Sequence, residues 1–94
     1  MSHIKVAHIR QQGVDLIIVP FDRQFGSKSR LDQNSVISQL QLIARSAGLA
    51  GTVVPVWDHG SGRMAFIAPT NWQRFFQSIS LSWMWANVNR ELSW

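Results

Sequence analysis

The sequence contains no cysteine among its 94 residues, so neither a disulfide bond nor a thiolate zinc site can form. Charged residues are also scarce, at 15% against a usual value of about 25%. No apolar run reaches the roughly 20 residues that a membrane-spanning helix needs, and the N-terminal stretch lacks the continuous apolar segment of a signal peptide. We therefore expect one soluble, cytoplasmic domain over residues 1–94, without a membrane partner.

The charge that is present has a positive balance, and large aromatic side chains are frequent. Nine Lys and Arg oppose five Asp and Glu, which gives a net charge of +4, and there are five Trp and five Phe. A basic surface attracts anions such as nucleic acid. A small domain with few charges and five Trp has difficulty hiding its apolar surface, which favours an oligomer or another partner.

Four segments have the patterns of β-strands. Residues 4–10 alternate between two faces, and residues 14–19 (VDLIIV) are mostly β-branched and apolar, as in a strand buried on both faces. Residues 52–57 and 63–68 are the third and fourth predicted strands, although Pro55 favours an edge position or a bulge for the third.

One amphipathic helix is predicted between the two pairs of strands. Asp32 is a suitable N-cap, and Gly48 followed by Leu49 is typical of a Schellman-type end. Between these ends, apolar residues recur at three- and four-residue spacing: Val36, Ile37, Leu40, Ile43, Ala44 and Ala47.

The two halves of the sequence share a pattern. A shift of 49 residues brings Gly13 onto Gly62 and Pro20 onto Pro69, and each half reads as a hairpin, a proline and a helix. We therefore predict an α+β fold with the order ββαββα, in which a single antiparallel-rich sheet carries two helices packed on one face. Two related halves are a further expectation.

The C-terminal segment, residues 70–94, admits two structures. One is a single helix, opened by a capping-box pattern at Thr70, whose 3.6-residue spacing favours it. The other is a short helix over residues 70–77 that runs into a fifth strand, because residues 78–83 (SISLSW) alternate between polar and apolar.

As a single helix, this segment has one apolar stripe for the sheet and a second on the opposite side. A surface helix of a small monomer should not be apolar on both sides. We therefore predict that the second stripe mediates self-association, with a homodimer favoured, through Leu81, Met84, Trp85, Val88 and Leu92.

The stretch VPFDRQFGSKSRLD, residues 19–32, resembles a phosphate loop only in composition. A nucleotide-binding P-loop requires G-x-x-x-x-G-K-[ST]. Here Ser27 separates Gly26 from Lys28, and no glycine stands at the first position. The expected sheet is also antiparallel and lacks a βαβ unit, so we exclude a nucleotide-hydrolysing site.

The same loop has the composition of a single-strand binding surface. Its cations interleave with aromatic rings, and cations bind phosphates while rings stack on bases. We predict that Arg23, Phe25, Lys28 and Arg30 contact nucleic acid. The alternative is a solvated surface loop in which Phe21 or Phe25 belongs to the core.

Few residues suggest catalysis. Asp58 and His59 are adjacent in the turn DHGSG, and His8 is the other histidine considered, but no further ligand completes a metal or general-base set. A polar hairpin turn is the favoured interpretation. We predict no catalytic residue, no metal site, no cofactor and no enzyme.

Together these patterns predict a small non-enzymatic binding module. It would self-associate through its Trp-rich C-terminal segment and contact nucleic-acid phosphates through the basic loop. The alternative is a protein-interaction or inhibitor module with no nucleic-acid role.

Overall fold

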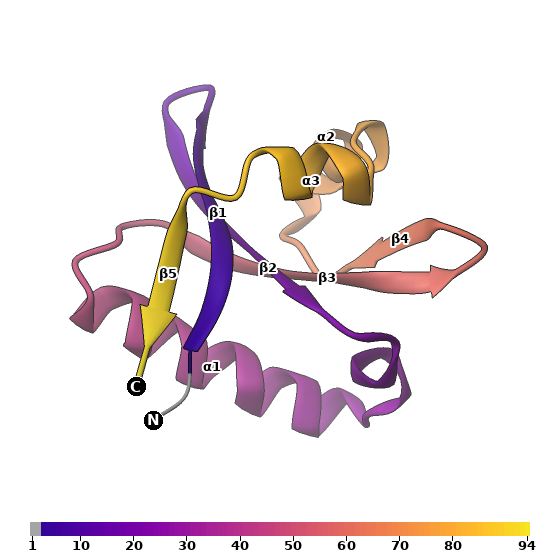
Figure 1. Cartoon of the computed structure of the whole chain (residues 1–94), viewed down its shortest axis with the longest axis horizontal. Coiled ribbons are helices and arrows are strands. Elements are labelled where there is room, and N and C mark those ends of the chain that lie inside the picture. The colour runs from indigo at the N-terminus through magenta and orange to yellow at the C-terminus, as the bar shows by residue number, and fades with distance from the viewer. Residues whose placement is uncertain (1–2) are drawn as a thin grey trace.

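The computed structural model describes residues 3–94, which form one five-stranded sheet with helices on both faces (Figure 1). The strand order is β4-β3-β2-β1-β5, and the predicted α+β class is confirmed. The strands are β1 (His3–Gln11), β2 (Val14–Phe21), β3 (Thr52–Gly60), β4 (Arg63–Phe66) and β5 (Arg90–Ser93). The helices are η1 (Arg23–Ser27), α1 (Arg30–Ser46), η2 (Thr70–Trp72), α2 (Gln73–Ser78) and α3 (Leu81–Ala86), where η marks a 3₁₀ helix.

The sheet is mostly antiparallel, as predicted, but its central pair is parallel. Ile18 of β2 lies beside Val54 of β3, and α1 forms the crossover that a parallel connection requires. Because β2 and β3 run in the same direction, η1 and the β3–β4 turn lie at one end of the sheet. The β1–β2 turn lies at the other end (Figure 1).

Pro55 lies in an inner strand, so the predicted edge position is wrong, and the irregularity of β3 lies beyond it, between Asp58 and Gly60. Pro55 pairs with Val19 of β2 on one side, and β4 reaches only as far as Val56 on the other. The nitrogen of Pro55, which has no hydrogen to donate, therefore faces the side of β3 on which β4 has already ended. The carbonyl of Pro55 still accepts a hydrogen bond from the N–H of Ile67, at 3.1 Å. A proline fits here because the neighbouring strand is short.

The two faces of the sheet carry separate apolar clusters, because successive residues of a strand point to opposite sides. Leu16 and Ile18 pack with η2, α2 and α3, including Trp72, Phe76 and Met84. Ile17 and Val19 pack with α1 and β5, including Leu40, Ala44 and Leu92.

The prediction that both helices pack on one face is therefore wrong. Figure 1 shows α1 on one side of the sheet and α2 with α3 on the other. The physical reason lies in β2, whose residues 16–20 are all buried, so both of its faces need a helical cover. The order within each half is as predicted, with a hairpin followed by helices.

The ends of α1 show one wrong and one confirmed prediction. The N-cap is Ser29 and not Asp32, because the Oγ of Ser29 accepts the N–H of Asp32 at 3.1 Å. At the other end, the N–H of Leu49 donates to the carbonyl of Ala44 at 2.9 Å, while Gly48 adopts a φ of +80°. This is the predicted Schellman end.

The C-terminal segment is not one helix. Helix α2 ends before Ile79, which is extended (φ −107°, ψ 166°), and Ser80 then caps α3 by accepting the N–H of Trp83 at 3.1 Å. The alternative of a helix followed by a strand is closer, although the strand is β5 and not residues 78–83. No side chain caps the first turn at Thr70, so the capping box is also wrong.

None of the helices between residues 3 and 94 has both the length and the apolar character needed to cross a membrane.

Candidate functional site

The basic loop is a well-packed turn at the carboxyl end of β2. Asp22 opens η1, since its Oδ1 accepts the N–H of Gln24 at 3.1 Å. Phe25 is only 2% exposed, and its ring stacks on Phe21 with a centroid distance of 4.3 Å. The other side of the Phe25 ring approaches Trp57 at 5.2 Å. The structure thus contradicts a base-stacking role for Phe25 and agrees with the alternative in which it belongs to the core.

The three cations of the loop are exposed, but one already has an acidic neighbour. The guanidinium Nη2 of Arg23 lies 3.8 Å from Oδ2 of Asp58 at the end of β3. Lys28 follows η1 and Arg30 begins α1, both at the surface. Contact with nucleic acid remains a prediction, and it now depends on the cations Arg23, Lys28 and Arg30 without Phe25.

One of the two reasons for excluding a P-loop was wrong. The chain does contain a βαβ unit, β2–α1–β3, and the loop connects its first strand to its helix. The other reason stands, because Ser27 still separates Gly26 from Lys28.

The five residues predicted for self-association do not form one surface. Met84 and Leu92 are fully buried, in clusters on opposite faces of the sheet. Leu81 and Val88 are half-buried and pack against the first of these clusters. Trp85 is the exposed member of the set. The predicted stripe is wrong because α3 ends at Ala86 and the chain continues into β5.

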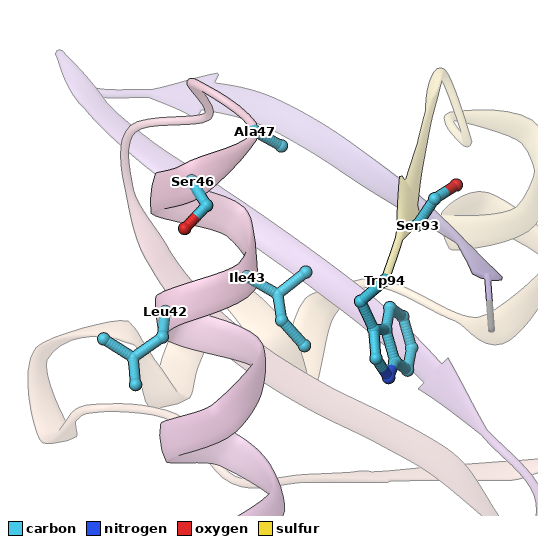
Figure 2. Close-up of a pocket in the computed structure, with 6 residues that line it drawn as sticks. All are labelled: Leu42, Ile43, Ser46, Ala47, Ser93 and Trp94. Carbon is cyan, nitrogen blue, oxygen red and sulfur yellow. The ribbon is translucent and has the colours of Figure 1, made fainter. Parts of the chain in front are cut away.

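A different apolar surface lies where the C-terminal half of α1 faces the end of β5. A groove of about 320 Å³ separates them. Leu42 and Trp94 are 63% and 50% exposed. Figure 2 shows Ile43 pointing toward the Trp94 indole, with Leu42 on the outer side of α1. The groove is lined by Leu42, Ile43, Ser46, Ala47, Ser93 and Trp94.

The groove was not predicted from the sequence, although one feature of α1 indicated it. Leu42 interrupts the polar side of α1 next to Gln41, outside the apolar spacing of the helix. Trp94 follows Leu92 by two residues, so in a strand both side chains face the same way. Only the pairing of β5 with β1 places that face beside α1.

The histidines and Asp58 do not converge. Nε2 of His8 lies 2.9 Å from the carbonyl oxygen of Ala50, in the loop after α1. Oδ1 of Asp58 accepts the N–H of Gly60 at 2.8 Å, as in the polar turn that the sequence favoured. Between residues 3 and 94, no group of three potential metal-binding side chains occurs. That the protein is no enzyme remains a prediction.

Comparisons with models of protein families, with curated proteins and with solved structures found no match for this chain. Its function is therefore inferred from its own surface. The groove beside Trp94 is the largely apolar candidate, and a smaller polar pocket lies beside Arg23 and Asp58 at the far end of α1.

Proposed function

We propose that the protein is a non-enzymatic binding module that self-associates as a twofold dimer through the edge of β5 and the adjoining groove. The observation that carries this proposal is the groove itself, where Leu42 and Trp94 leave large apolar side chains in water. Trp is enriched at the centres of protein interfaces and supplies much of their binding energy. The Trp-rich C-terminal segment thus keeps its proposed role, but through different residues.

The edge of β5 adds backbone groups to the same surface. β5 pairs with β1 on one side, and within residues 3–94 no strand pairs with its other side. Such an edge presents N–H and C=O groups that can pair with another strand. A second copy of β5 offers the same groups, so one twofold axis can pair both edges.

The side chains of β5 disfavour one antiparallel register and make another self-complementary. In an antiparallel pair, residues directly opposite each other point to the same face of the sheet. Two copies of β5 therefore pair around a residue that lies opposite the same residue of the other copy. A pairing centred on Glu91 would bring two carboxylates together, which is destabilising. A pairing centred on Leu92 instead places Arg90 of one copy opposite Trp94 of the other.

This second register is self-complementary. Arg90 and Leu92 pair with Val6 and Ile4 of β1, whose side chains belong to the cluster on the α1 face. Trp94 lies on the same face, beside α1. An Arg guanidinium over a Trp ring gains a cation–π attraction of about 0.5–1 kcal/mol or more. The twofold axis provides this contact twice.

The test is the mass of the wild-type protein in solution. Sedimentation velocity across a concentration series should show a species of twice the chain mass that dissociates on dilution. A single species of one chain mass at every concentration would contradict the proposal. In that case the exposed groove would favour the protein-interaction or inhibitor module, with a foreign partner in place of a second copy.

A further inference from the structure

A small pocket of about 240 Å³ lies at the carboxyl ends of the parallel strands β2 and β3. Ligands of open sheets with parallel strands bind at such ends. Pockets for drug-sized ligands measure roughly 300–1,000 Å³, so this one suits a single small group. Its walls come from η1 and the end of β3, and it is lined by Arg23, Gly26, Ser27, Trp57, Asp58 and His59.

A hydrogen-bond donor without a protein acceptor lies in the wall of this pocket. Trp57 is only 8% exposed, and none of the hydrogen bonds between residues 3 and 94 uses its indole N–H. The indole is held by Phe25 on one side and by the backbone of Gly26, where an added Cβ would overlap Nε1. None of the buried side-chain nitrogens between residues 3 and 94 lacks a partner, so this unpaired Nε1 reaches the surface of the pocket, where its N–H can donate. An acceptor in the pocket would satisfy this one.

Further donors surround the indole. Arg23 supplies a guanidinium, which can form two parallel hydrogen bonds to one oxyanion. Ser27 and His59 are exposed at the rim and can each add a donor. The lining thus contains more donors than acceptors.

Asp58 is the acidic residue in the lining, and both of its oxygens have other partners. Oδ1 accepts the N–H of Gly60 at 2.8 Å, and Oδ2 faces Arg23 at 3.8 Å. An exposed ion pair of this length is weak, so Arg23 can turn toward a better acceptor. While Arg23 faces Asp58, their opposite charges cancel. The pocket attracts an anion only when the guanidinium of Arg23 turns toward it.

We infer that this pocket binds a phosphate group, free or as a phosphomonoester, held chiefly by Arg23 and the indole N–H of Trp57. The chemistry matches, because phosphate oxygens accept from both guanidinium and N–H donors. The site is independent of the proposed dimer, since it lies before the first turn of α1 whereas the groove lies at its C-terminal half. Phosphate binding and self-association can therefore fail separately.

The experiment is a titration of the ¹⁵N-labelled protein with inorganic phosphate, at an ionic strength held constant with sodium chloride. Five Trp give five indole N–H signals, and the variant Trp57→Phe identifies the relevant one. We expect the Trp57 signal to move and saturate, while the other four move little. A Trp57 signal that moves neither with inorganic phosphate nor with a nucleoside 5′-monophosphate would overturn the inference.

Matched variants separate a site from general attraction to a basic protein. Arg23→Gln should weaken phosphate binding at least tenfold or so, because it removes a charge-assisted contact. Arg10→Gln is the control, since Arg10 has the same 3.8 Å pairing with an aspartate, Asp15, at the other end of the sheet. It should leave the affinity unchanged. Equal losses in the two variants would contradict a specific site.

A third variant is expected to act in the opposite direction. Asp58→Asn removes the negative charge but keeps an oxygen for the N–H of Gly60, so phosphate should bind about threefold more tightly. The source of the phosphate is tested with a nucleoside 5′-monophosphate and its nucleoside. Saturation by the monophosphate or by inorganic phosphate, with no response to the nucleoside, supports the inference. An equal response to the nucleoside would overturn it.

Discussion

Replacing Trp94 with alanine is expected to raise the dissociation constant of the dimer by roughly 30-fold or more, a loss of about 2 kcal/mol. The reason is that Trp94 lines the groove beside α1 and stands at the end of β5, where the proposed pairing places it against Arg90 of the second copy. Its exposure means that the folded monomer loses little packing. Sedimentation velocity measures the change directly.

Trp85 provides the matched control for this prediction. It is a tryptophan of similar exposure, 54% against 50%, but it lies on α3. Trp85→Ala should leave the dissociation constant within about threefold of the wild-type value, as surface substitutions outside an interface do. If Trp85→Ala dissociates the dimer and Trp94→Ala does not, the interface lies on α3, near the surface that the sequence predicted.

Replacing Gly51 with alanine should destabilise the monomer by about 3 kcal/mol or more. Gly51 leads into β3 with a φ of +128°, a conformation that costs other residues of order 1–3 kcal/mol. An added Cβ would also lie 2.6 Å from the carbonyl oxygen of Asp15 in β2, and such crowding costs typically 1–3 kcal/mol. A domain of this size is stable by only about 5–15 kcal/mol, so the loss would be large.

Urea unfolding of Gly51→Ala beside Gly48→Ala checks this reasoning. Gly48 also has a positive φ, +80°, but nothing lies within 4 Å of an added Cβ. Its replacement should cost only about 1 kcal/mol. Equal losses in the two variants would show that the close approach of Gly51 to β2 contributes nothing to stability.

The elements with strong local patterns could be predicted from the sequence. The run at residues 14–19 identified β2, and the apolar spacing of α1 with Gly48 after it identified that helix and its end. The N-cap of α1 was predicted three residues too late, because Ser29 and Asp32 are both good N-cap residues. The course of the backbone before the helix decides which of the two caps it.

The arrangement of these elements depends on contacts between distant residues, which local patterns do not report. The run in β2 indicated burial on both faces, yet the parallel pairing of β2 with β3 follows from α1 crossing one face. In the C-terminal segment, the 3.6-residue spacing continued across Ser80, where a side-chain cap starts a new helix. Leu92 has the spacing of the predicted helical stripe, although it is buried in a strand, β5.

For the candidate sites, too, local patterns could be predicted from the sequence, whereas contacts between distant residues could not. Arg23 was recognised as a basic loop residue, but its neighbours Trp57 and Asp58 come from β3 and meet it only because β2 and β3 are parallel. Phe25 looked available for stacking because the loop is polar around it, and the structure buries it between Phe21 and Trp57. Sequence patterns thus indicated the kind of residue but not its neighbours.

The most direct test of the central proposal is a paramagnetic measurement between two copies. Since the chain has no cysteine, Ser38→Cys creates a single thiol for a nitroxide label, on the exposed side of α1 one turn before Leu42. Labelled protein without ¹⁵N is mixed with unlabelled ¹⁵N protein, so any signal loss arises between copies. We expect the signals of β5 and the Trp94 indole to broaden. Broadening confined to α3, or none at concentrations where a dimer sediments, would contradict an interface at β5 and the groove.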